Sequence, residues 1–284
     1  MSKIFEALQR SVSERTGYPL SEAPVIATEL LEETEKAASI ESCSALVPNP
    51  SPESRVVAII DAGGIAAEKF RLLAVRLRNL KQKRDLKRVL VTSALPDEGK
   101  SVVAVNLACT LARYKQLRVL LVEGDMRRPR ISANLGLPPM KGLSEWLRSD
   151  IPISELIYRV NPPGLSLWLL PAGEPISDPV ELMQSGRLAS LLDRLTESFD
   201  WIIIDSTPIL PVADTSVWAR LSQGILMVVR ESKTEKRQLQ KALDALESSL
   251  FLGAVFNSSS NNEHKSYYTY YGASLTNAIP EQDI

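Results

Sequence analysis

One polar segment, between an apolar run and a long helical pattern, constrains the fold of this chain most. Residues 88–93 read RVLVTS, residues 94–101 read ALPDEGKS, and VVAVNLACTLARY follows without glycine or proline. This order matches A/G-x-x-x-x-G-K-S/T between a strand and a helix, where backbone N–H groups and the helix N-terminus bind phosphate. The sequence therefore predicts a nucleotide phosphate site formed by Pro96, Asp97, Glu98, Gly99, Lys100, Ser101 and Val102.

Short apolar runs and longer helical patterns alternate along most of the chain. The runs that predict strands are 88–93, 118–125, 165–173, 201–207, 224–230 and 252–257. A helix is expected after Gly63-Gly64, and further helices at 100–114, 143–149, 180–199, 214–222 and 234–249. Strands that are apolar on both faces and alternate with helices are typical of a parallel sheet covered on both sides. We therefore expect one α/β domain at 55–257, P-loop NTPase-like, with a mostly parallel sheet and helices on both faces.

Three carboxylates are expected beside the phosphate loop. WIIID (201–205) ends on Asp205 at the carboxyl edge of a buried strand, where ligands bind in open α/β sheets. Glu123 and Asp125 lie two residues apart, so their side chains are expected on one side of another strand end. Acids beside a triphosphate bind Mg²⁺ directly or through water, or accept a proton. The sequence thus predicts a Mg²⁺ site that uses Ser101, Asp125 and Asp205.

The two ends of the chain differ from the domain between them. Residues 1–54 combine a short amphipathic helix at 2–13 with a proline-rich stretch, which predicts a disordered linker. That helix is expected either to dock on a partner or a membrane surface, or to be a terminus that folds onto its own domain. Residues 258–284 read as a flexible polar tail that carries Tyr267, Tyr268, Tyr270 and Tyr271. Taken alone, the tail fits a disordered binding segment or an edge strand.

Composition and charge exclude several classes of function. The net charge of −1 and the pI near 6.1 provide no basic field for nucleic acid. The single histidine, His264, excludes most zinc sites and histidine-based triads. Two cysteines in no metal-like spacing favour a reduced, cytoplasmic protein. The sequence also lacks an apolar run near ~18 residues, so we expect no membrane span.

The motifs resemble those of the bacterial tyrosine kinases of exopolysaccharide and capsule synthesis. ALPDEGKS looks like their Walker A motif, VLLVEGDMRRP like their Walker A′ motif and FDWIIIDSTP like their Walker B motif. Three segments between and after these motifs also follow the family pattern, namely LGLPPMKGLSEWL, LWLLPAGEPISDPVELMQS and VVRESKT. The resemblance covers about 60–271, and SYYTYYG corresponds to the family's C-terminal tyrosine cluster.

The resemblance implies an enzyme that uses ATP and Mg²⁺ to phosphorylate its own tyrosine cluster. The implied catalytic residues are Lys100, Glu123, Asp125 and Asp205. In this assignment Lys100 and Mg²⁺ neutralise the phosphoryl oxygens, and Glu123 accepts or orients the proton of the tyrosine. The phosphorylated residues are then the four tyrosines of the tail.

The resemblance also implies partners. Subunits of the family form a ring, often of eight, in which each tail enters the neighbouring site. Glu68 and Arg71 match an E-x-x-R-x-x-R-like helix at the ring interface, whereas Ala74 stands at the third position. A separate membrane polysaccharide co-polymerase is the implied activator, which places the chain at the inner face of the membrane.

Two departures from the family pattern leave other functions open. Asp97 replaces the usual glycine of the loop, and Glu123 replaces the usual aspartate in the role of base. Misplacement of a catalytic group by about 1 Å costs ~10²-fold, so a non-catalytic nucleotide-binding scaffold is one alternative. A ParA/MinD-like regulatory ATPase is the other, although its early loop lysine is replaced here by Leu95.

Overall fold

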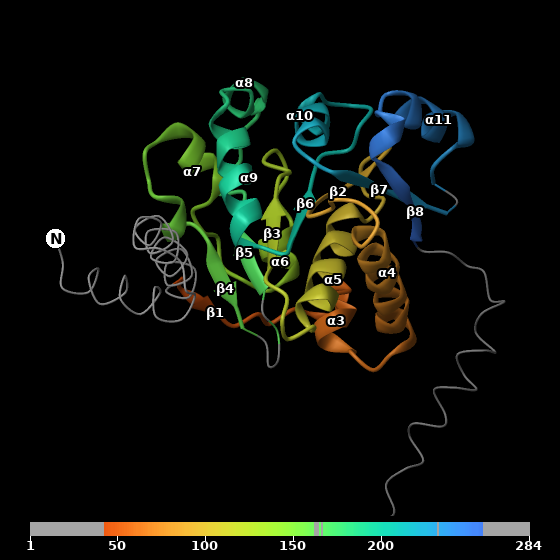
Figure 1. Ribbon diagram of the computed structural model, residues 1–284, viewed down its shortest axis with the longest axis horizontal. Coiled ribbons are helices and arrows are strands. Elements are labelled where there is room, and N and C mark those ends of the chain that lie inside the picture. Colours follow the sequence, from red (N-terminus) through yellow and green to blue (C-terminus); the bar gives the residue numbers. More distant parts are fainter. Residues whose placement is uncertain (1–42, 162–164, 166, 232, 258–284) are drawn as a thin grey trace, which may run out of the picture. The chain divides into compact units, whose positions relative to one another are not determined.

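The computed structural model describes most of the chain between residues 43 and 257. The described residues are 43–161, 165, 167–231 and 233–257 (Figure 1). The folded unit that contains the sheet begins at Ala45.

Among the described residues, eight strands form one sheet in the order β1-β4-β5-β3-β6-β2-β7-β8. Every neighbouring pair is parallel except β4 and β5, which are antiparallel. The strands are β1 Ala45–Leu46, β2 Arg88–Ser93, β3 Val119–Glu123, β4 Tyr158–Val160, β5 Leu167–Leu170, β6 Trp201–Asp205, β7 Gly224–Arg230 and β8 Phe251–Asn257. The predicted mostly parallel α/β fold is confirmed.

Helices connect most of the parallel strands. They are α3 Val57–Ile60, α4 Ile65–Lys81, α5 Lys100–Ala112, α6 Ile131–Asn134, α7 Leu143–Arg148, α8 Val180–Met183, α9 Arg187–Ser198, α10 Asp214–Arg220 and α11 Lys236–Asp244. Single 3₁₀ turns lie at Pro52–Ser54, Ile153–Glu155 and Ser248–Leu250. The loops that matter for function follow β2, β3, β6 and β7, because they leave the carboxyl edge of the sheet.

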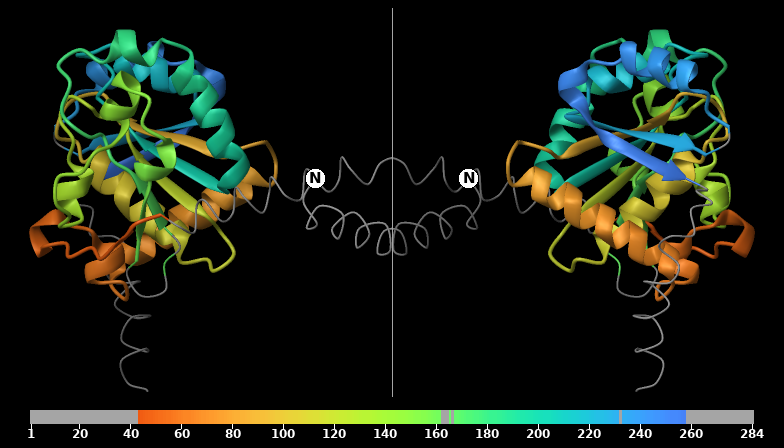
Figure 2. Two further views of the ribbon diagram at one scale, coloured as in Figure 1. Left: turned by 90° about the vertical axis from the view of Figure 1, so that its left-hand side faces the viewer. Right: turned by 90° about the vertical axis from the view of Figure 1, so that its right-hand side faces the viewer.

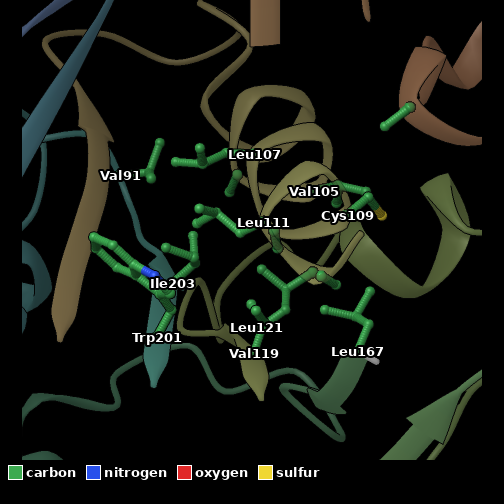
Figure 3. Packing of buried hydrophobic residues seen from close by; sticks show 14 of the residues in the cluster. Val91, Val105, Leu107, Cys109, Leu111, Val119, Leu121, Leu167, Trp201 and Ile203 are labelled. Atoms are coloured by element: carbon green, nitrogen blue, oxygen red, sulfur yellow. The ribbon is translucent and has the colours of Figure 1, made fainter. Parts of the chain in front are cut away.

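The largest hydrophobic cluster lies between α5 and one face of the sheet. Leu107 and Leu111 of α5 lie over strand residues that include Val91, Leu121 and Ile203 (Figure 3). All five side chains are fully buried. Burial of one such side chain stabilises the fold by about 1.5–3 kcal/mol, so this packing fixes α5, and with it the residues at its N-terminus.

The opposite face of the sheet is also covered. Along β7, Leu226 and Val228 join the α5 cluster, whereas Met227 and Val229 pack with Ala242 of α11. Figure 2 shows the strands between α4 on one side and α9 on the other. Helices on both faces explain why the strands are apolar at consecutive positions instead of alternate ones.

Three features differ from the sequence-based expectations. Ala45 and Leu46 lie in the stretch expected as a linker, yet they pair with β4 in the sheet. The strand β4 was not predicted, because a three-residue run carries too little pattern to be seen. The helix expected at 180–199 is two helices, since Gly186 has φ +73° and interrupts the helical backbone.

Candidate active site

The P-loop (residues 94–101) joins β2 to α5 (Figure 1). Its backbone is left-handed at Asp97, with φ +60°, and at Gly99, with φ +92°. Aspartate tolerates this region better than most residues, which explains how it stands where glycine is usual. Glycine suits position 99 because φ +92° strains any residue with a side chain, and an added Cβ would lie 2.1 Å from Nδ2 of Asn257 and displace that side chain. The loop therefore delivers the first-turn N–H groups of α5, which have no helical acceptors, to an anion.

Lys100 is the first residue of α5 and reaches the loop after β3. Its Nζ lies 3.0 Å from Oδ2 of Asp125, and both side chains are largely buried. Burial alone lowers the pKa of Lys100, but the carboxylates of Asp205 and Asp125 outweigh it and raise the pKa. The ammonium is therefore charged at neutral pH. The structure brings Lys100, Asp125 and Asp205 together, as the motifs predicted.

Asp205 ends β6 as a fully buried carboxylate. Within the described residues, neither of its oxygens accepts a hydrogen bond of normal geometry. Burial raises its pKa to about 7, although Lys100 and the nearby hydroxyl of Ser101 favour the charged form. A buried carboxylate without a donor is costly, and a hard divalent cation would remove that cost.

The residues around Asp205 fit Mg²⁺. Ser101, Asp125 and Asp205 supply a hydroxyl and two carboxylates, which are the oxygen ligands that this ion takes. In the part of the chain that the structure describes, no three His, Cys, Asp or Glu residues are grouped to hold a metal. The remaining ligands of a Mg²⁺ ion would therefore be water and phosphate oxygens, which is usual for nucleotide sites.

The pKa of Asp205 predicts how the stability of the metal-free protein depends on pH. The pKa rises from 3.8 to about 7 on folding, so this group favours folding below pH 3.8 and loses that contribution as pH rises toward 7. Between pH 5 and 8 in a chelating buffer, the Tm of wild type should fall a few degrees more than that of Asp205→Asn. About 1 kcal/mol corresponds to ~2–4 °C at this size. Equal falls by calorimetry would contradict the unpartnered carboxylate.

Glu123 ends β3, and both of its oxygens accept hydrogen bonds. Oε1 accepts from the N–H of Ile131 at 2.5 Å, while Oε2 accepts from the N–H of Ala172 at 3.1 Å. Burial raises the pKa of Glu123, and these backbone donors lower it. The carboxylate thus joins the start of α6 to the loop after β5. Its role as the proton acceptor stays a prediction.

Two contacts with α10 shape the loop after β3, and local patterns did not indicate either. Nε1 of Trp218 donates to the carbonyl oxygen of Gly124 at 3.1 Å. Arg127 donates to both carboxylate oxygens of Asp214, at 2.8 and 3.0 Å. The partners lie 94 and 87 residues apart along the chain, so no short motif could have identified them. They fix the position of Asp125 from both sides.

No protein-family model matches the chain, but sequence comparison finds relatives. Tyrosine-protein kinase YwqD of Bacillus subtilis is 32% identical over 222 residues, which cover 78% of this chain and 92% of YwqD. The chain belongs to the bacterial tyrosine-protein kinases. The fold described above is therefore that of a P-loop kinase domain.

Two further comparisons support this family assignment. The succinoglycan biosynthesis transport protein ExoP of Rhizobium meliloti is 32% identical to it over 218 residues, which cover 73% of this chain and 27% of ExoP. The kinase domain of the Escherichia coli tyrosine kinase ETK superposes with a TM-score of 0.66 at 25% identity, covering 72% of this chain and 82% of that one. The resemblance in the motifs is thus confirmed, as is the P-loop kinase fold.

The helix α4 of this kinase carries the residues expected at a subunit interface. Nε of Arg71 donates to Oε2 of Glu68 at 2.8 Å, and both side chains are partly exposed. Ala74 is fully buried, so an arginine at that position would have to displace the packing beneath α4. The helix also exposes Leu72 and Val75. The interface itself stays a prediction.

Two expectations concern residues outside the described part of the chain. These are the amphipathic helix at 2–13 and the substrate tyrosines, Tyr267, Tyr268, Tyr270 and Tyr271. In the part that is described, no helix has the length and apolar character needed to cross a membrane.

Proposed function

We propose that this kinase transfers the γ-phosphoryl group of Mg·ATP to the tyrosines of its own tail, between copies of the chain. The observation that carries the proposal is the buried carboxylate of Asp205, whose oxygens find no donor among the described residues. Lys100, Ser101 and Asp125 surround it, so a metal-bound triphosphate would complete the site. The tyrosine cluster supplies an acceptor within the same chain.

The residues divide the chemistry between them. Mg²⁺, when bound, neutralises charge on the phosphate oxygens. Lys100 offers its ammonium to the same oxygens, and the P-loop N–H groups orient them for in-line transfer. The tyrosine oxygen forms a bond to the γ-phosphorus while the bond from that phosphorus to the ADP oxygen breaks. We assign to Ser101, Asp125 and Asp205 the holding of the metal.

The proton of the tyrosine needs an acceptor, since a hydroxyl with a pKa near ~10 arrives protonated. Glu123 lies at the end of β3, and each of its oxygens has a lone pair beyond the one that accepts from Ile131 or Ala172, so it can still take the proton. Asp125 assists through water in this scheme. Its Oδ1 accepts from the N–H of Arg128 and its Oδ2 faces Lys100, and these two contacts hold the side chain in one orientation.

The length of the tail suits transfer to a neighbouring copy. The ten residues from Asn257 to Tyr267 span about 33 Å when fully extended. We place the copies in a ring of up to eight that meets in part through Glu68 and Arg71. The relative ExoP supports a role in exopolysaccharide polymerisation or export, with a membrane polysaccharide co-polymerase as the activating partner at the inner membrane face.

The decisive experiment mixes two inactive chains. One carries Lys100→Met and an intact tail; the other carries phenylalanine at all four tail tyrosines and an intact site. Wild type with Mg·ATP should show phosphotyrosine at 267–271 by mass spectrometry, and each variant alone should show none. In the mixture we expect phosphotyrosine on the Lys100→Met chain, because only its neighbour supplies a working site.

The other outcomes identify the alternatives. Phosphotyrosine in wild type but not in the mixture would indicate transfer within one chain. ATP hydrolysis without phosphotyrosine, also with the cytoplasmic fragment of the co-polymerase present, would favour a regulatory ATPase. Nucleotide binding without turnover would leave the scaffold function.

A further inference from the structure

Side chains from two distant segments bind successive carbonyl groups of the P-loop. Nζ of Lys233 donates to the carbonyl oxygen of Pro96 at 2.9 Å. Nη1 of Arg230 donates to that of Asp97 at 3.1 Å. The next carbonyl, of Glu98, accepts from Nδ2 of Asn257 at 2.9 Å. These donors come from the last residue of β7, from the loop that follows it and from the last residue of β8.

The planarity of the peptide bond gives these contacts a consequence for phosphate binding. In a trans peptide the C=O and the following N–H point in opposite directions. Three carbonyls held toward β7 and β8 therefore direct the N–H groups of Asp97, Glu98 and Gly99 to the other side of the loop. A run of N–H groups with left-handed residues is a concave anion site. The contacts thus set the orientation of the donors that a triphosphate needs.

The side chain of Glu98 connects the loop to itself and to the segment after β7. It is fully buried. Oε2 accepts from the N–H of Leu95 at 2.8 Å, and Oε1 accepts from the hydroxyl of Thr234. Burial raises the pKa of Glu98, whereas the backbone donors and Lys233 lower it. Losing the Thr234 hydroxyl would leave part of a buried carboxylate unpaired.

The same segment also balances the charge that Asp97 adds beside the phosphates. Nζ of Lys233 lies 3.9 Å from Oδ2 of Asp97, in a partly exposed ion pair. Such a pair contributes little to stability. Its position matters more, because the ammonium lies next to the carboxylate and offsets part of the negative charge that Asp97 adds. The departure from glycine at Asp97 is thus accompanied by two cations, Arg230 and Lys233, from another part of the chain.

We infer that Arg230, Lys233, Thr234 and Asn257 form a P-loop clamp that holds the loop in its phosphate-binding conformation. These are positioning residues, since they act through the P-loop backbone and Glu98. Asn257 is also the residue after which the tyrosine tail begins. The residue that carries the tail is therefore hydrogen-bonded to the P-loop, through the carbonyl oxygen of Glu98. The inference rests on the proposed function only in taking Mg·ATP as the ligand.

Nucleotide affinity of the full chain tests the clamp. We expect Asn257→Ala and Thr234→Val to weaken binding of Mg·ADP and Mg·ATP roughly tenfold by calorimetric titration, which is the effect of one lost hydrogen bond to a preorganised site. Thr234→Ser keeps the hydroxyl and should bind like wild type. Phe256→Ala is the matched control, because Phe256 is an exposed neighbour of Asn257 and is not among the residues that donate to the P-loop carbonyls described above.

Kinetics separates positioning from general destabilisation. The KM for ATP should rise in the clamp variants while kcat at saturating ATP changes less than threefold, and the rise should be rescued in Thr234→Ser. If Asn257→Ala fails to fold, comparing the nucleotide affinities of Thr234→Val and Thr234→Ser tests the clamp instead. Equal affinities in Thr234→Val, Thr234→Ser and wild type would overturn the clamp.

The outcome is distinguishable from failure of the proposed function. Weakened nucleotide binding in the clamp variants of a chain that forms no phosphotyrosine would support the clamp and reject the kinase proposal. Phosphotyrosine formation in wild type, together with nucleotide affinities of the clamp variants equal to wild type, would support the kinase proposal and reject the clamp. A wild-type chain that binds neither nucleotide would overturn both.

Discussion

Lys100→Met is expected to lower the rate of tyrosine phosphorylation by about 10²–10³-fold or more, which is the effect of removing one preorganised group that stabilises transition-state charge. Lys100 is the cation that faces both Asp125 and Asp205. Methionine preserves the length and apolar stem of the side chain but leaves two buried carboxylates and the phosphates without it. Quantitative mass spectrometry of the tail, at matched ATP saturation, measures the loss.

Lys115→Met is the matched control for this change. Lys115 is an exposed lysine just beyond the C-terminal end of α5, so its replacement removes the same charge from the same part of the chain without touching the site. Its phosphorylation rate should stay within about twofold of wild type. A Lys100→Met chain that phosphorylates its tail at the wild-type rate would show that the P-loop is not the site of transfer.

Glu123→Ala is expected to lower the free energy of unfolding by roughly 2–4 kcal/mol, because it leaves buried N–H groups unpaired. Those groups belong to Ile131 and Ala172, which are held by the two carboxylate oxygens. Part of the loss is offset, since burying the carboxylate itself is unfavourable, as its raised pKa indicates. Urea unfolding with and without Mg·ADP gives the value.

Glu155→Ala provides the comparison, as Glu155 is exposed in a 3₁₀ turn, and surface changes usually stay within about 0.5 kcal/mol. Glu123→Gln then separates structure from chemistry. If Glu123→Gln unfolds like wild type and binds ATP normally but transfers no phosphate, Glu123 is the proton acceptor. If stability and transfer fall together, its bonds to the backbone account for the result.

The strands and the main helices could be predicted because their signals are local. β2, β6 and β7 are apolar at consecutive positions, which indicates a sheet covered on both faces. β1 and β4 could not be predicted, because two or three residues carry no periodicity and because β1 pairs with a distant strand, as Ala45 does with Arg159. The division between α8 and α9 depends on one left-handed glycine, Gly186, within a pattern that otherwise reads as continuous.

The candidate site likewise contains features that local sequence predicts and features that depend on distant contacts. Lys100, Ser101, Asp125 and Asp205 follow from strand ends in a parallel sheet, because those ends meet at one edge. The hydrogen bonds that Glu123 accepts from the N–H groups of Ile131 and Ala172 could not be predicted. A carboxylate at a strand end has the same sequence pattern whether it faces a ligand or the backbone. Arg230 and Asn257 contact P-loop residues that lie 133 and 159 positions away along the chain. Contacts over such separations cannot be predicted from a short stretch of sequence.

The positions of β1 and β8 at the two edges of the sheet have a consequence for how the kinase is tethered. The chain enters the sheet at one flank and leaves it at the other, seven strand spacings away, or roughly 34 Å at about 4.8 Å each. A partner that bound at β1 would therefore contact the flank of the sheet far from Asn257. Under the proposed function, in which the tail beyond Asn257 is the substrate, such a partner would leave the opposite edge of the sheet accessible to a neighbouring copy.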